Sequence, residues 1–164
     1  MQSNSYKFQT QWRVEATAEE IYDLISHPLD FPRWWPAVYL HVEEIRPADK
    51  DGLGGCVRLH TKGWLPYTLT WESCCTEAER PTRLAIRATG DFEGTGLWTI
   101  RQDGRHANVT FDWQIRAEKP VLRYFSFLLK PIFAANHHWA MAQGERSLKN
   151  ELARSRKQSG RVAE

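Results

Sequence analysis

Hydrophobic and polar side chains alternate with a period of two over much of the chain. In the clearest run, 108–115, four apolar residues alternate with four polar ones. This is typical of a strand with one buried and one wet face. Residues 6–16 alternate in the same way, with Phe8, Trp12 and Val14 on one face. Similar runs bounded by turn residues predict further strands at 38–46, 56–62, 67–76, 84–88 and 93–101.

The segment after the first strand changes to helical spacing. Thr17 fits a helix N-cap, and Glu20 three residues later completes a capping box. Apolar side chains follow at helical spacing until Pro28, which ends this short helix. A second short helical segment is expected over 29–35, stopped by Pro36.

From Pro120 onward the pattern is helical again, with one apolar stripe that runs through Phe133, His137 and Met141. Because Pro131 lacks a backbone N–H, it should kink or break this run, and we expect a short helix at 122–129 and a main helix at 132–154. Gly144 on the buried side is expected to let this helix approach the sheet closely. Residues 155–164 are polar and are expected to form a frayed tail.

This order of elements predicts the fold class. Sequential antiparallel strands usually pair with their neighbours, so the chain is expected to be an α+β protein. We expect a seven-stranded curved antiparallel sheet that grips a long C-terminal helix, with two short helices between the first and second strands. At 164 residues, the chain is expected to form a single domain, 1–164.

Three segments resemble one known group of proteins. Residues 14–25 (VEATAEEIYDLI) resemble its first strand and first helix, 30–36 (DFPRWWP) the end of its short helix pair, and 136–152 (NHHWAMAQGERSLKNEL) its C-terminal helix. The group is the SRPBCC or START-like superfamily, which includes birch-pollen-allergen-like proteins. The last segment is similar to the bacterial polyketide cyclase/dehydrase-like branch. The resemblance implies a helix-grip fold with an internal cavity, and functions that range from lipid carriers to cyclases.

Composition narrows the possible partners and locations. The net charge of +2 gives no general attraction to nucleic acid, so none is expected as a partner. No apolar stretch reaches membrane-spanning length, and the N-terminus lacks a signal-peptide core, so a cytoplasmic location is expected. The oligomeric state is left open, with a homodimer as one option.

The 3 cysteines are expected to be reduced thiols. Cys74 and Cys75 are adjacent in a predicted strand and leave it on opposite faces, so Cys56 could reach only one of them.

Aromatic and apolar residues of the strands and the last helix are candidates for the wall of a ligand cavity. The candidates are Trp34, Trp35, Tyr67, Trp71, Phe92, Trp98, Phe111, Trp113, Phe125, Phe133, His137 and Met141, with Trp139 in the same aromatic set. The alternative is a filled core made of the same side chains.

His137 is the best single candidate for a catalytic group. It lies one helical turn before Met141 on the apolar stripe, so burial should lower its pKa and keep it neutral. The adjacent His138 diverges by about 100° on a helix, so the pair is unsuited to one metal ion. No CxxC pair or dinucleotide-binding motif is present, so neither a metal nor an organic cofactor is expected.

Several charged or polar strand residues are expected on the wet face of the sheet. They are His41, Arg58, His60, Glu72, Arg87 and Asp112. Because a register slip of one residue would turn them inward, an acid/base pair from this group stays open.

Three functions are compatible with these observations. The first is the binding of a small hydrophobic molecule, such as a lipid, a polyketide or an aromatic metabolite, between the sheet and the last helix. The second is a cyclase- or dehydratase-type reaction in the same cavity, with His137 as its main polar group. The third is a non-catalytic protein-interaction module, which a filled core would favour.

Overall fold

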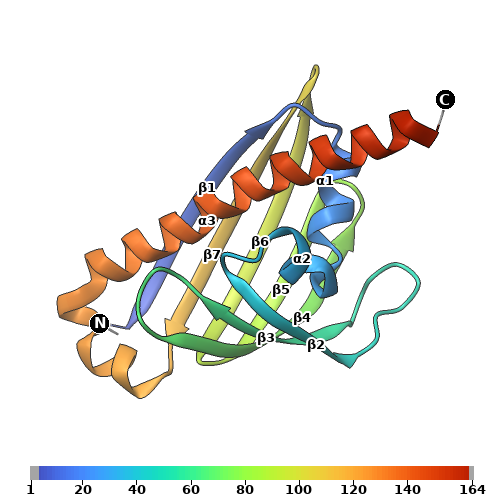
Figure 1. The fold of residues 1–164 in the computed structure, drawn as a ribbon. Coiled ribbons are helices and arrows are strands. Elements are labelled where there is room, and N and C mark those ends of the chain that lie inside the picture. Colours follow the sequence, from blue (N-terminus) through green and yellow to red (C-terminus); the bar gives the residue numbers. More distant parts are fainter. Residues whose placement is uncertain (1–3, 163–164) are drawn as a thin grey trace.

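Seven strands and one long helix account for most of the chain (Figure 1). The computed structural model describes the backbone of residues 4–162 and their side chains except those of 121, 122 and 125–129. The strands are β1 (Ser5–Val14), β2 (Tyr39–Arg46), β3 (Cys56–Lys62), β4 (Thr68–Glu79), β5 (Arg83–Gly90), β6 (Phe92–Asp103) and β7 (His106–Ala117). The helices are α1 (Ala18–Ile25), the 3-10 turn η1 (Pro28–Asp30), α2 (Phe31–Trp34) and α3 (Pro120–Val162).

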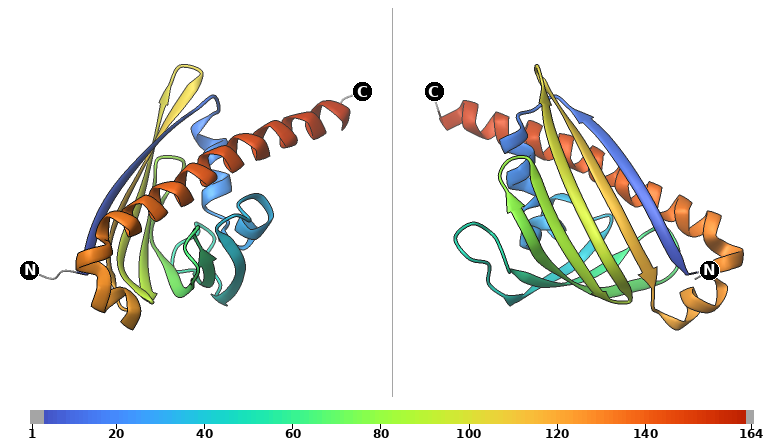
Figure 2. Two further views of the ribbon diagram at one scale, coloured as in Figure 1. Left: turned by 60° about the vertical axis from the view of Figure 1, so that its left-hand side comes forward. Right: turned by 180° about the vertical axis from the view of Figure 1, so that it is seen from behind.

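All strands belong to one antiparallel sheet in the order β1-β7-β6-β5-β4-β3-β2. Neighbours in sequence pair along the sheet, except that β1 and β2 lie at opposite edges. The short helices α1, η1 and α2 carry the chain across between these edges. Figure 2 shows the curved sheet with α3 crossing its concave side. The predicted α+β helix-grip fold with its seven-stranded sheet is confirmed.

The start of α1 is fixed by the predicted capping box. The Glu20 N–H donates to Thr17 Oγ1 (3.2 Å), and the Thr17 N–H donates to Glu20 Oε2 (2.8 Å). These bonds satisfy backbone donors that a helix N-terminus otherwise leaves free. The side chains of Ile21 and Ile25 are buried on the face of this helix that packs toward the sheet.

The two faces of the sheet have different chemistry. Inward-facing residues of β7, such as Val109 and Trp113, are buried, whereas the alternate residues are more exposed. On the outer face, Arg58 pairs with Glu43 (3.4 Å) and Glu72 (3.0 Å) across adjacent strands. Arg58 and Glu72, two of the residues expected on the wet face, therefore form an exposed cross-strand pair.

The last helix differs from its expected boundaries. It is a single helix that includes Pro131, so of the two outcomes expected at this proline, a kink or a break, the separate helices do not form. Figures 1 and 2 show that its first part runs in a different direction from the rest, so the helix turns without ending. Residues 155–162, expected to fray, continue the helix. Within the described residues, no helix has the length and apolar character needed to cross a membrane.

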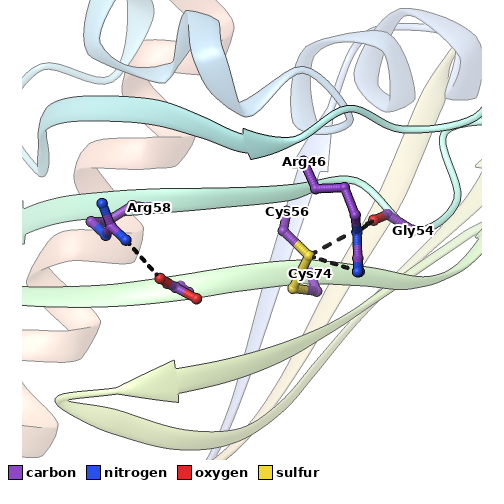
Figure 3. Close-up of a disulfide and its surroundings, with 6 residues drawn as sticks. Arg46, Gly54, Cys56, Arg58 and Cys74 are labelled. Atoms are coloured by element: carbon purple, nitrogen blue, oxygen red, sulfur yellow. Dashed lines mark hydrogen bonds and ion pairs between the residues drawn. A yellow bond between two sulfur atoms is a disulfide. The ribbon is translucent and has the colours of Figure 1, made fainter.

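The expectation of three reduced cysteines is wrong. Cys56 and Cys74 form a disulfide, and Cys75 is a free thiol (Figure 3). The two bonded residues are register partners in β3 and β4, with Cα atoms 4.1 Å apart. Cys74 and Cys75 do point to opposite faces of β4, and it is Cys74 that faces Cys56.

Candidate functional site

A cavity of about 790 Å³ lies between the concave face of the sheet, α3 and the short helices. Its volume falls in the usual range for small-molecule sites, roughly 300–1,000 Å³. Ten of the twelve residues predicted for its wall do line it: Trp35, Tyr67, Trp71, Phe92, Trp98, Phe111, Trp113, Phe133, His137 and Met141. The helix-grip fold therefore leaves a cavity where a filled core was the alternative.

Stacked aromatic rings of the central strands form the floor of this cavity. Trp98 and Phe111 are register partners in β6 and β7, and their rings stack with centroids 4.2 Å apart. Phe111 also stacks on Trp113, which in turn contacts Trp71 of β4 at 5.6 Å. Because alternate residues of a strand share one face, these rings form one continuous apolar surface.

The two tryptophans at the end of α2 have different positions. Trp35 lines the cavity, whereas Trp34 does not. Trp34 is buried beside it, stacked on Trp35 at 5.5 Å and edge-on to Phe31 at 5.5 Å. Trp35 is the C-cap of α2 and has left helical geometry (φ −126°, ψ 52°), so the backbone directs it differently from Trp34, the last residue of the helix. Trp34 is therefore a packing residue, which corrects its assignment to the wall.

Two further members of the predicted aromatic set do not add to the observed wall. The side chain of Phe125 lies outside the described residues. Trp139 lines a second, outer groove together with Trp64, Leu65 and Pro66.

Several wall residues were missed in the sequence. Phe8 of β1 lines the cavity, and its alternation with Trp12 would have placed it there. Phe31 and Tyr39 also line it and contact each other at 4.8 Å. Phe31 begins the four-residue helix α2 and Tyr39 begins β2, and the stretch from one to the other has no regular period, so the sequence held no signal for their orientation.

The polar groups that lie among the aromatic rings of the wall, those of Thr61, Tyr39 and Tyr67, are neutral. Trp71 Nε1–H donates to Thr61 Oγ1 (3.2 Å), so these two buried groups satisfy each other. Burial raises the pKa of Tyr67 to about 12, with a further contribution from nearby Tyr6, and burial also raises the pKa of Tyr39. Both phenols are therefore protonated at neutral pH, and this part of the wall carries no charge.

His137 lies on the buried stripe of α3 and lines the cavity, as the sequence predicted. Its ring stacks on Phe8 with centroids 4.3 Å apart and an interplanar angle of 19°. Burial, together with a smaller contribution from the adjacent His138, lowers its pKa to about 4. Its Nε2 atom is fully buried and has no hydrogen-bonding partner among the described residues. The ring is neutral at pH 7 and contributes mainly its flat surface.

Asn136 connects α3 to the loop between β3 and β4. Its Oδ1 accepts hydrogen bonds from the backbone N–H groups of Trp64 (2.9 Å) and Leu65 (3.3 Å). The loop approaches so closely that a Cβ built on Gly63 would lie 2.0 Å from the same oxygen. Since Gly63, Tyr67 and Asn136 all line the cavity, this contact closes one side of it.

Charged residues gather at the opposite rim. Arg80 binds Asp23 through two hydrogen bonds of 3.0 Å, and both residues line the cavity at the end of α1. Leu29 of η1, which is 50% exposed, and Lys50 and Asp51 of the β2–β3 loop complete this rim. Exposed side chains in the lining indicate that the cavity opens to solvent here.

A buried carboxylate fixes α2 to α3 behind the cavity. Glu151 is 6% exposed and bonds to Arg33 of α2 (2.5 Å) and to Arg154 (2.8 Å). The hydrogen bond from Arg154 lowers the pKa of Glu151 against the opposing effect of burial, and Arg33 lowers it further. No sequence pattern distinguishes this residue from the other charged positions of the last helix.

The described part of the chain holds no group of three or more His, Cys, Asp or Glu side chains arranged to bind a metal ion. The polar groups of the cavity wall are spread over separate elements, such as Thr61 on β3 and His137 on α3. A ligand in the cavity would therefore contact these polar groups at separate points, because they do not form one cluster.

Comparison with known families gives one clear match. The sequence profile described as "Polyketide cyclase / dehydrase and lipid transport" matches residues 5–153. The match begins in β1 and ends near the C-terminal part of α3, so it covers all the elements that surround the cavity. No curated protein matches the sequence significantly.

Solved structures with the same fold are distant in sequence. The protein TTHA0849 of Thermus thermophilus superposes with a TM-score of 0.75 at 15% identity, covering 92% of this chain and 99% of its own. The Zhui aromatase/cyclase of Streptomyces sp. R1128 gives 0.69 at 16% identity, covering 92% and 94%. A START superfamily protein of Mycobacterium smegmatis gives 0.68 at 14%, covering 90% and 97%. At these identities the similarity establishes the fold.

Proposed function

Since the chain belongs to the polyketide cyclase/dehydrase and lipid transport family, we propose that it binds a small hydrophobic molecule in the cavity between the sheet and α3. The cavity of about 790 Å³ is the observation that carries this proposal. A lipid, a polyketide or an aromatic metabolite has the required apolar character. A cytoplasmic location and the absence of nucleic-acid binding stay predictions of the sequence.

The chemistry of the wall favours a neutral ligand with aromatic or aliphatic surface. Trp71, Trp98, Phe111 and Trp113 provide flat rings on which another ring can stack. An anionic group placed against these rings would lose its hydration without gaining a partner, which costs several kcal/mol or more. Charged or strongly polar parts of a ligand would therefore lie at the rim near Arg80 and Asp23.

The alternative of a rigid interaction module has less support. A protein that used only its outer surface would gain stability from a filled interior, because close packing is the normal state of a core. An open apolar volume of this size is retained here between β4, β6, β7 and α3. Ligand binding gives that volume a role.

Catalysis at His137 also has less support than binding. A general acid or base works best when its pKa is near the working pH, and the pKa of His137 is lowered to about 4. Its Nε2 atom is fully buried, which separates it from a substrate in the cavity. A cyclase- or dehydratase-type reaction would need a proton acceptor other than His137 in this conformation.

The proposal can be tested with a neutral apolar fluorophore, N-phenyl-1-naphthylamine, and a matched pair of variants on α3. Ala140 lines the cavity, whereas Ala142 is exposed on the same helix. Ala140→Phe should fill part of the ligand space and weaken saturable binding about tenfold, equivalent to ~1.4 kcal/mol. Ala142→Phe should bind as the wild type does.

Native mass spectrometry of gently purified protein complements this titration, because it detects a ligand that is retained through purification. Circular dichroism establishes that both variants are folded. A fluorescence change that stays linear with probe concentration in the wild type would contradict the proposal. So would equal weakening by Ala140→Phe and Ala142→Phe.

A further inference from the structure

The Cys56–Cys74 disulfide joins β3 to β4 beside the loop that follows β2. Figure 3 shows Arg46 reaching across from β2 to the sulfur of Cys56 and to the backbone of Gly54. Arg46 and Cys56 are register partners, so strand pairing itself places the guanidinium at this sulfur. The disulfide and the arginine form one cluster at the end of the β3–β4 hairpin.

The two sulfur-bearing residues have different surroundings. Cys56 is only 5% exposed, whereas Cys74 is partly exposed. A thiolate that attacks a disulfide must approach one sulfur and expel the other. The difference in burial favours attack at Cys74, with Cys56 as the residue that leaves.

The positive charge of Arg46 lies beside Cys56, the sulfur that would leave when the disulfide is attacked. Its Nη2–H donates to Cys56 Sγ (3.1 Å), while its Nε–H donates to the Gly54 carbonyl (2.8 Å) and holds the guanidinium in place. Among the described residues, Arg46 forms no ion pair with a carboxylate. A nearby guanidinium stabilises a cysteine thiolate and makes it a better leaving group.

We infer that this cluster is a site of thiol–disulfide exchange with low-molecular-weight thiols. The thiolate of the small molecule forms a bond to Cys74 Sγ, and the Cys56–Cys74 bond breaks. The bonding electron pair stays on Cys56 Sγ, which becomes a thiolate beside Arg46. One thiolate is consumed and one is released, so the exchange needs no other oxidant or reductant. The product is a mixed disulfide on Cys74, and attack by Cys56 on that bond reverses the reaction.

Cys75 provides an internal comparison. It is adjacent to Cys74 but lies on the opposite face of β4, where it lines the cavity. Burial raises the pKa of its thiol, which keeps it protonated and poorly nucleophilic at neutral pH. The small thiol is therefore expected on Cys74 and not on Cys75.

The experiment treats the oxidised protein with glutathione without air, quenches with acid, and maps the adduct by peptide mass spectrometry. The adduct should appear on Cys74, with Cys56 free. Arg46→Gln should slow its formation about tenfold, because the leaving Cys56 thiolate loses the neighbouring positive charge. Arg58→Gln is the matched control. Arg58 lies on β3, next to the strand that carries Arg46, and pairs with Glu43 and Glu72 instead of sulfur. Its rate should equal that of the wild type.

A second measurement keeps the test independent of the folding of Arg46→Gln. The ultraviolet absorbance of the Cys56 thiolate is titrated in the variant Cys74→Ser with Cys75→Ser, and ionisation should occur below the ordinary cysteine value of about 8.5. Three free thiols in the air-oxidised wild type would overturn the proposal. An adduct that forms first on Cys56, an unchanged rate in folded Arg46→Gln, or an ordinary Cys56 ionisation would also overturn it. All of these measurements are made without added ligand, because Arg46 and Cys56 also line the cavity.

Discussion

Gly144 of α3 lies directly against the indole of Trp35. A Cβ built on Gly144 would be 2.3 Å from Cζ2 of Trp35, far inside van der Waals contact. The glycine therefore lets the last helix accept a cavity-lining tryptophan that comes from the end of α2. The sequence correctly indicated a close approach at Gly144, but the partner is this indole and not the sheet.

We predict that Gly144→Ala destabilises the protein by about 1–3 kcal/mol, because the indole of Trp35 must shift to admit the methyl group. Gly160→Ala in the same helix is the control, since nothing lies within 4 Å of its Cβ position. There the higher helix propensity of alanine should be neutral or stabilising, by up to about 1 kcal/mol. Urea denaturation measures both, and equal effects would contradict the assigned packing.

Asn136→Ala should accelerate the exchange of a bound apolar probe. The substitution removes the acceptor for the N–H groups of Trp64 and Leu65, so the β3–β4 loop separates more easily from α3. Stopped-flow dissociation of N-phenyl-1-naphthylamine should be several-fold faster, because each lost hydrogen bond is worth about 1 kcal/mol. Asn150→Ala, at an exposed position of α3, should leave the rate unchanged.

Glu151→Gln should lower the free energy of unfolding by about 1–3 kcal/mol at pH 7, since it weakens charge-assisted bonds from Arg33 and Arg154. The folded-state pKa of Glu151 lies below the ordinary 4.5, so its stabilising effect is present above pH 4.5 and lost as the pH falls further. The difference from wild type should therefore shrink in acid. Glu145→Gln, which affects a more exposed pair with Lys149, should change stability by less than about 0.5 kcal/mol.

His137 should make the protein less stable in mild acid. Its pKa falls from 6.5 when unfolded to about 4 when folded. The unfolded chain therefore binds the proton first, and stability falls as the pH drops from about 6.5 to 4. The loss is on the order of 3 kcal/mol for this shift. His137→Phe should show a flatter dependence in urea melts over this range, while a substitution at exposed His41 should not.

Local interactions were predicted correctly from the sequence. The Thr17 and Glu20 capping box involves residues three apart, and it forms as expected. The alternation in β7 placed Phe111 and Trp113 on the face that lines the cavity. Such features depend on a few neighbouring residues and on backbone geometry, so they can be predicted from the sequence alone.

The disulfide was missed although part of its signal is present in the sequence. The β3–β4 hairpin pairs Lys62 with Thr68 and continues outward residue by residue to Cys56 and Cys74. Symmetry about the loop would have placed the two cysteines opposite each other, once the strand ends were known. The register of a hairpin is fixed by its turn and by which face is buried. The alternation of side chains alone did not determine the register of β3 and β4.

The order of elements, the faces of the strands and most of the apolar residues around the cavity could be predicted from the chain alone. The folded structure was needed to show that Trp35 enters the cavity while Trp34 packs behind it, that Asn136 binds the β3–β4 loop, and that Glu151 is buried between two arginines. The difference lies in the range of the interactions. Periodicity and capping act between neighbours in the chain, whereas the contacts of Asn136 with Trp64 and of Arg33 with Glu151 join residues more than 70 positions apart.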